Sequence, residues 1–187
     1  MFELALKTAI AKLRAAKAEQ LLEDFALIGA FAVSRWATPR ATGDIDFVIS
    51  SSKNKLPELA SFCAGELRLG DVKDPLLATI SFEINDENGA IPIQLVLLPP
   101  AWERIALLDV LEEDLGEMIV PIVNWRALVL LKLYAGLALD LQDAKNILLS
   151  VDPSETALQP ILQTAKSLRV DRRLTKLIRE IQNAEGQ

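Results

Sequence analysis

The feature that most constrains this chain is a strand, a glycine and a second strand within residues 25–50. An apolar run ends at Gly29, and the second strand opens with Asp44 and carries Asp46. Strand side chains separated by one residue lie on the same face, because they alternate sides with a period of two. The two carboxylates therefore point in one direction. This arrangement suits Mg²⁺, which is usually held by one or two carboxylates together with substrate phosphates.

The patterning of the N-terminal half predicts a mixed sheet with helices. We expect, in chain order, an amphipathic helix over 1–23, a strand over 25–28, a helix from Gly29, a strand over 44–49, a helix over 56–67 capped by the turn residues 50–54, and strands over 77–84 and 91–98. The turn-forming residues 85–89 join the last two strands, which predicts an antiparallel hairpin.

A change of pattern near residue 100 predicts the domain organisation. Pro99 and Pro100 end the run of strands, and the later sequence is helical except for a short strand expected over 118–123. We therefore expect an α/β (α+β) core over 1–100, followed by a mainly helical region over 101–187 that packs on the core.

Composition excludes several classes of function. The net charge of −6 gives no general attraction for nucleic acid phosphates, and the absence of histidine excludes His-based triads and the usual zinc sites. The single cysteine, Cys63, is expected to be a buried small residue in a reducing cytoplasm. Residues 1–23 mix charged with apolar positions rather than forming a secretion signal. The apolar stretch 127–141 is too short to span a bilayer, so no membrane association is expected.

The residues around the two carboxylates resemble the signature of the nucleotidyltransferase superfamily. That signature is an apolar residue, Gly, Gly or Ser, a helical spacer, and then Asp-apolar-Asp. Here it reads Ile28-Gly29-Ala30, a spacer over 31–43, and Asp44-Ile45-Asp46-Phe47.

Two further stretches are similar to one branch of the superfamily, which includes the abortive-infection nucleotidyltransferase toxins and many uncharacterised bacterial relatives. Arg40 and Thr42 precede Asp44 as in the Arg-x-Thr-x-Asp-Ile-Asp of that branch. The later stretch 124–149 resembles its helix pair, and the matching positions there are Lys132, Ala135, Gly136, Asp140 and Asp143. Together these stretches cover roughly residues 20–150.

The resemblance implies a fold and a reaction. The fold is a nucleotidyltransferase-like mixed sheet flanked by helices and followed by a C-terminal helical region. Asp44 and Asp46 would be catalytic metal ligands for Mg²⁺, with Mn²⁺ as an alternative, and Lys132 a third catalytic residue. The nucleoside triphosphate would contact Gly29, Ala30, Arg40 and Thr42. The acceptor hydroxyl would belong to an RNA, a protein or a small molecule.

Three positions depart from the pattern. Gln94 stands where active relatives carry a third carboxylate, which is thought to act as general base and to help hold the metals. Ala30 replaces the second Gly or Ser, and Leu137 replaces an Arg. These departures favour a second hypothesis. The chain would then be an inactive or impaired binding or regulatory protein of a toxin–antitoxin-type pair, with a partner encoded by a neighbouring gene.

Each candidate residue also has a plainer interpretation. Asp44 and Asp46 would then cap a strand in an interaction protein, Arg40 and Thr42 would solvate and cap a loop, and Lys132 would extend its charge to water. Asp140 and Asp143 would be solvated or would pair with Lys132 or Lys145. Glu83 would replace the missing carboxylate if it and Gln94 were cross-strand neighbours.

The C-terminal basic residues have two interpretations as well. They would form either the solvated face of two closing helices or a docking site for a polyanion. The residues are Lys166, Arg169, Arg172, Arg173, Lys176 and Arg179.

Overall fold

The computed structural model describes residues 2–71, 74–86, 89–116 and 118–185. Within them, one mixed sheet has the strand order β3-β4-β5-β2-β1-β7-β6. Its strands are β1 (Asp24–Leu27), β2 (Ile45–Ser50), β3 (Glu66–Leu69), β4 (Ala78–Asp86), β5 (Gly89–Leu97), β6 (Leu111–Asp114) and β7 (Ile119–Ile122). The helices are α1 (Phe2–Ala18), α2 (Gly29–Trp36), α3 (Leu56–Cys63), α4 (Pro100–Leu108), α5 (Trp125–Ala135), α6 (Ala138–Val151), α7 (Glu155–Ser167) and α8 (Asp171–Glu185), with a short 3-10 helix at Lys53–Lys55.

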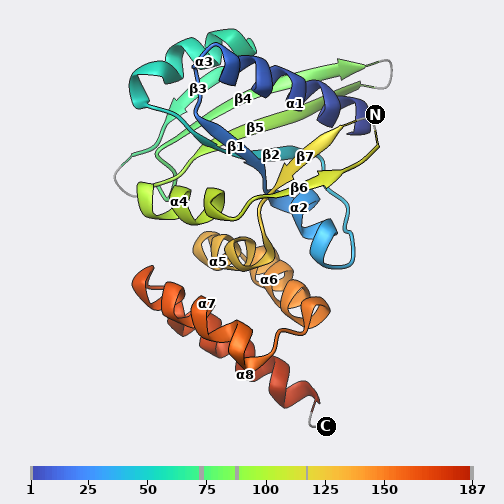
Figure 1. Ribbon diagram of the computed structural model, residues 1–187, viewed down its shortest axis with the longest axis vertical. Coiled ribbons are helices and arrows are strands. Elements are labelled where there is room, and N and C mark those ends of the chain that lie inside the picture. The colour runs from blue at the N-terminus through green and yellow to red at the C-terminus, as the bar shows by residue number, and fades with distance from the viewer. Residues whose placement is uncertain (1, 72–73, 87–88, 117, 186–187) are drawn as a thin grey trace.

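The helices lie on both faces of the sheet (Figure 1). Helices α1 and α3 cover one face, and α2 and α4 lie on the other. The pair α5–α6 packs beyond α2 and α4, and the pair α7–α8 forms the far end of the molecule (Figure 1). Any site on the second face of the sheet therefore lies between the core and the helical region.

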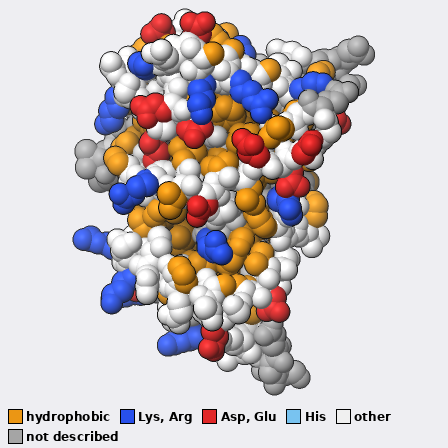
Figure 2. Space-filling model, viewed as in Figure 1, with side chains coloured by type: hydrophobic (Ala, Val, Ile, Leu, Met, Phe, Trp, Pro, Cys, Tyr) orange, Lys and Arg blue, Asp and Glu red, His pale blue; other side chains and the backbone are white. Residues whose placement is uncertain are grey.

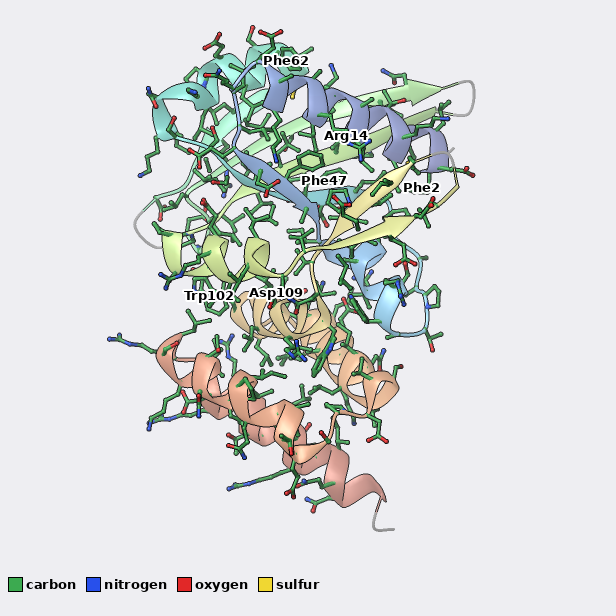
Figure 3. All side chains as sticks on the ribbon, viewed as in Figure 1. Phe2, Arg14, Phe47, Phe62, Trp102 and Asp109 are labelled. Carbon is green, nitrogen blue, oxygen red and sulfur yellow. The ribbon has the colours of Figure 1, made fainter. Side chains whose placement is uncertain are left out.

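Strand β2 lies inside the sheet and sets the direction of its side chains. It pairs antiparallel with β1 and parallel with β5. Phe47 is fully buried on the α1 side, where its ring meets Phe25 edge to face with centroids 6.1 Å apart (Figure 3). Asp46 lies on the opposite face because it alternates with Phe47. On that same face Ser50 donates a 2.9 Å hydrogen bond to Glu103 of α4.

Most of the expected elements are found, and the corrections concern β6, the end of α3 and the cap of α3. The strands expected over 25–28, 44–49, 77–84, 91–98 and 118–123 correspond to β1, β2, β4, β5 and β7, and β4 and β5 form the antiparallel hairpin. Residues 87–88 of its expected turn lie outside the described residues. Strand β6 was not expected. Strands β6 and β7 join the same sheet as the strands before residue 100.

The helix expected over 56–67 is too long, and its expected serine cap is absent. Helix α3 ends at Cys63, because Ala64 adopts a left-handed conformation with φ of 55°. Residues Glu66–Leu69 form the edge strand β3 instead, which pairs with β4. Ser52 makes no side-chain cap bond, and Lys55 precedes α3.

The helix pair expected over 124–149 is confirmed as α5 and α6. Asn124 caps α5 by accepting hydrogen bonds from the backbone N–H groups of Arg126 and Ala127, and Gly136 ends it with φ of 72°. Beyond them, α7 and α8 form a hairpin. The basic residues named above are exposed there, and Figure 2 shows Lys and Arg side chains projecting around this end. None of the helices among the described residues has the length and apolar character of a membrane span.

Candidate functional site

The structure places the two predicted carboxylates at the start of β2. Asp44 is exposed just before the strand, and Asp46 is half-buried within it. Thr42 donates a 2.7 Å hydrogen bond from Oγ1 to Oδ1 of Asp44, which fixes that carboxylate relative to the preceding loop. The hydroxyl of Thr42 therefore bonds to the Asp44 carboxylate itself.

Gly29 lies directly against Asp46. The backbone N–H of Ile28 donates to the carbonyl of Asp46 at 2.9 Å, which joins the start of α2 to β2. Gly29 has φ of +67°, and a Cβ atom built there would lie 2.1 Å from Oδ2 of Asp46. Only glycine allows this approach without strain. Ala30, the next residue, is small and buried.

Arg40 is bound by a buried carboxylate from the helical region. Its Nε and Nη2 donate to Oδ1 and Oδ2 of Asp143 on α6, each at 2.9 Å. The side chain of Asp143 is 1% exposed and that of Arg40 is 29% exposed. This bidentate geometry is the strong form of a carboxylate–guanidinium contact. The loop before Asp44 is thereby attached to α6, so Arg40 is not a purely solvating residue.

Lys132 on α5 belongs to the same network. Its Nζ lies 2.9 Å from Oδ1 of Asp140 and 2.9 Å from Oδ2 of Asp143. The lysine is 9% exposed, so it does not extend its charge to water. Of the two plainer interpretations of Asp140 and Asp143, solvation or pairing with a lysine, the structure shows pairing with Lys132, between helices α5 and α6 rather than along one helix. Asp140 also accepts from the N–H of Leu137 at the start of α6.

The charges around Asp46 change its pKa. Burial and, to a smaller extent, the nearby charge of Asp44 raise the pKa of Asp46 to about 6, against the opposing effect of the nearby cations Lys132 and Arg40. For Asp143, burial alone would raise the pKa, but the hydrogen bonds from Arg40 and Lys132 outweigh it and lower the pKa. The two cations of the network thus act on both Asp46 and Asp143.

Gln94 occupies the position beside Asp46. The parallel register of β2 and β5 pairs Asp46 with Gln94, which is exposed. Glu83 does not replace a carboxylate there, because Ser81 is the residue of β4 opposite Gln94 and Glu83 lies opposite Pro92. Strand β5 separates Glu83 from β2. Among the described residues, no cluster of three or more Asp, Glu, His or Cys side chains is placed to hold a metal.

A pocket of about 260 Å³ opens beside these groups. Gly29, Asp46, Gln94, Lys132 and Asp140 supply its polar lining. Its apolar lining is formed by Ile28, Pro75, Leu76, Val96, Leu98, Leu128, Leu131, Tyr134 and Ala135. Tyr134 stacks on Trp102 with centroids 4.2 Å apart, where α4 meets α5 (Figure 3).

The donor set fits a Mg²⁺ ion that arrives with phosphates. Asp44 and Asp46 provide hard carboxylate oxygens, and Gln94 provides a neutral amide oxygen beside them. Mg²⁺ needs only one or two protein carboxylates when substrate phosphates and waters complete its coordination. Arg40 and Lys132 add positive charge near the two carboxylates, as a phosphate-binding site requires.

The sequence named Asp143 as a matching position and as a partner for Lys132 or Lys145, but not as a partner of Arg40. Its position four residues before Ile147 and next to Ala144, both buried on the inner face of α6, also indicated a buried carboxylate. A carboxylate on the buried side of a helix requires a cationic partner. Only the fold shows that Arg40, 103 residues earlier in the chain, is one of its partners.

Known structures share this fold. No protein-family model matches the chain, and no curated protein sequence matches it. An antigenic nucleotidyltransferase-like protein from Paracoccidioides brasiliensis is similar over 94% of this chain and 92% of its own, with a TM-score of 0.52 and 18% identity. The crystal structure of ANT(2″)-Ia in complex with adenylyl-2″-tobramycin is similar over 93% of this chain and 97% of its own, with a TM-score of 0.47 and 16% identity.

The first of these similarities defines the fold class. The chain has a nucleotidyltransferase-like fold, a mixed sheet flanked by helices, as the sequence resemblance implied. At 18% identity the similarity extends to the fold alone. The closer relationship to the branch with the abortive-infection toxins stays a prediction.

Gly29→Ala tests the close approach at the site. We expect it to lower the free energy of unfolding by about 1–3 kcal/mol, because alanine is strained at positive φ and its Cβ displaces the Asp46 carboxylate. Gly43→Ala is the matched control, because a Cβ there meets nothing within 4 Å. Urea unfolding of both variants measures the difference, and equal stabilities would contradict the packing described.

The raised pKa of Asp46 predicts a pH dependence in the metal-free protein. Between the ordinary value of 3.8 and about 6, the folded state binds more protons than the unfolded state, so stability falls as pH rises through this window. Asp46→Asn should therefore raise the free energy of unfolding by about 1–3 kcal/mol at pH 8 and by little at pH 4. Denaturant unfolding at both pH values measures this, and an effect of Asp46→Asn that is the same at both would show that the pKa is not raised.

Proposed function

We propose that this protein binds a Mg²⁺–nucleoside triphosphate at Asp44 and Asp46 and transfers its nucleotidyl group to a hydroxyl of an acceptor. The observation that carries the proposal is the convergence of two carboxylates, the start of α2 at Gly29 and two cations on one face of the sheet. Each group alone is common. Because a nucleotidyltransferase-like fold brings all of them together, the arrangement supports a role in nucleotide chemistry better than a role in strand capping.

Each residue has a role in this proposal. The first-turn N–H groups of α2 lack partners within the helix, so they suit the β- and γ-phosphates. Arg40 donates from Nε and Nη2 to Asp143 and from Nη1 to the carbonyl of Ala41 at 3.2 Å. These bonds use three of its five N–H groups, which leaves two for a phosphate. Lys132 contributes positive charge from α5, at the lining of the pocket beside Asp46.

The transfer step forms a bond between the acceptor oxygen and the α-phosphorus and breaks the bond from the α-phosphorus to the α–β bridging oxygen, so that the β- and γ-phosphates leave together as pyrophosphate. Asp44 and Asp46 would hold Mg²⁺, which when bound would neutralise charge on the α-phosphate and lower the pKa of the attacking hydroxyl. Gln94 cannot accept the hydroxyl proton as a carboxylate does, so the proton passes to a substrate phosphate or to water, and we expect a slow reaction.

A second candidate function is binding without catalysis. Gln94 beside Asp46 favours it, since the site then lacks the third carboxylate of active relatives. In this case the protein binds nucleotide as the regulatory half of a toxin–antitoxin-type pair. The partner would be a protein from a neighbouring gene.

Nucleotide binding tests both candidates against an interaction protein with strand-capping aspartates. Isothermal titration with each of the four ribonucleoside triphosphates and Mg²⁺ should show metal-dependent binding by the wild type. The double variant Asp44→Ala/Asp46→Ala should lose this binding, because it lacks both carboxylates that are proposed to hold the ion. Absence of binding by the wild type at millimolar nucleotide would reject both nucleotide-binding candidates.

Gln94→Asp separates a slow enzyme from a binding protein. A carboxylate opposite Asp46 restores a third metal ligand and a base, so nucleotidyl transfer or slow triphosphate hydrolysis should rise by at least tenfold in an enzyme. Release of pyrophosphate from labelled nucleotide measures the rate. The isosteric Gln94→Glu, whose carboxylate lies one bond farther out than that of Asp, is a second carboxylate variant. A rate that stays at background in both variants would favour the binding protein.

A further inference from the structure

Asp143 is the most buried charged side chain near the site, and it serves two cations at once. It is 1% exposed, and both of its oxygens are used: Oδ1 accepts from Arg40, and Oδ2 accepts from Arg40 and lies 2.9 Å from Lys132. The first cation comes from the loop before β2 and the second from α5. A single carboxylate of α6 therefore joins two separate elements at the edge of the proposed nucleotide site.

We propose that Asp143 is a positioning residue that orients Arg40 and Lys132 toward the phosphates of the bound nucleotide. The inference rests on the proposed function, because it assumes that the site takes a metal–nucleotide. Asp143 is buried beneath the two cations and touches them rather than the substrate. It acts through them, as a second layer of hydrogen bonds orients a ligating residue.

The charges in the network explain why such a residue is needed. Arg40 and Lys132 are long and lose rotamer freedom when they are held in place. Without a fixed partner, either cation would be attracted to Asp44 or Asp46, where it would compete with the metal. Asp143 pairs with both cations and so leaves the carboxylates of Asp44 and Asp46 available to the metal.

Asp140 provides the comparison within the same helix. It pairs with Lys132 at 2.9 Å and accepts from the N–H of Leu137, whereas the side-chain hydrogen bonds of Arg40 go to Asp143 and Ala41. Both aspartates lie on the side of α6 that faces α5. Loss of Asp140 therefore leaves Arg40 held, whereas loss of Asp143 releases Arg40 and removes half of the partners of Lys132.

A double-mutant cycle on nucleotide affinity tests this inference. The four proteins are the wild type, Asp143→Asn, Arg40→Ala and the double variant, each titrated with Mg²⁺–ATP. We expect each single variant to bind at least tenfold more weakly. We expect the double variant to bind little more weakly than Arg40→Ala, because Asp143 acts mainly by orienting Arg40. Asp140→Asn is the matched control, and its loss should be smaller than that of Asp143→Asn.

The outcomes separate this inference from the proposed function. No binding of Mg²⁺–ATP by the wild type would overturn the proposed function. Binding by the wild type, with the losses of the two single variants multiplying in the double variant, would overturn the positioning role alone. Near-UV circular dichroism checks that each variant is folded. If Asp143→Asn fails to fold, Asp143→Glu keeps the charge but shifts the carboxylate, and affinity equal to wild type in that variant would also contradict the inference.

Discussion

The position of β2 inside the sheet, between β1 and β5, is the constraint on which the candidate site depends. Pairing with both neighbours fixes the strand and buries Phe47 on the α1 side. Asp46 must then project from the other face, opposite Gln94 and against Gly29. A shift of register by one residue would reverse the faces and bury the carboxylate among apolar side chains. The hydrophobic pattern of β2 therefore places the chemistry as well as the core.

The helical region completes the electrostatics of this face. Lys132 comes from α5, and Asp140 and Asp143 come from α6, while Arg40 belongs to the loop before β2. Within this group of four the charges balance, and Asp44 and Asp46 remain as the excess negative charge. A divalent cation bound with phosphates suits such a site. The buried network also attaches the helices to the core at the point where the nucleotide is proposed to bind.

Much of the fold followed from local sequence patterns, because each depends on near neighbours in the chain. The alternation in 77–84 and the apolar run 91–98 gave the hairpin, and Asn124 with Gly136 bounded α5. Strand β3 was missed because the apolar spacing around 56–67 also suits a helix, and the left-handed residue that ends α3 is Ala64 rather than the following Gly65. The short, acidic edge strand β6 has little apolar patterning.

The site was predictable only in part, for a similar physical reason. Asp44, Asp46 and Gly29 are close in sequence, and their spacing identified them. The partners of Arg40 and Lys132 depend on the packing of α5 and α6 against the core, which no local pattern encodes. The failure of Glu83 as a substitute carboxylate likewise depends on the register of β4 and β5, which sets Ser81 rather than Glu83 opposite Gln94.

Asp44 and Asp46 are proposed to hold a metal–nucleotide beside the start of α2. A crystal structure of the wild type with Mn²⁺ and a non-hydrolysable ATP analogue tests this arrangement, because anomalous scattering locates the ion. We expect an anomalous peak in contact with Asp44 and Asp46, with the β- and γ-phosphates at the N–H groups of α2. A nucleotide bound elsewhere, or ions remote from both aspartates, would contradict it.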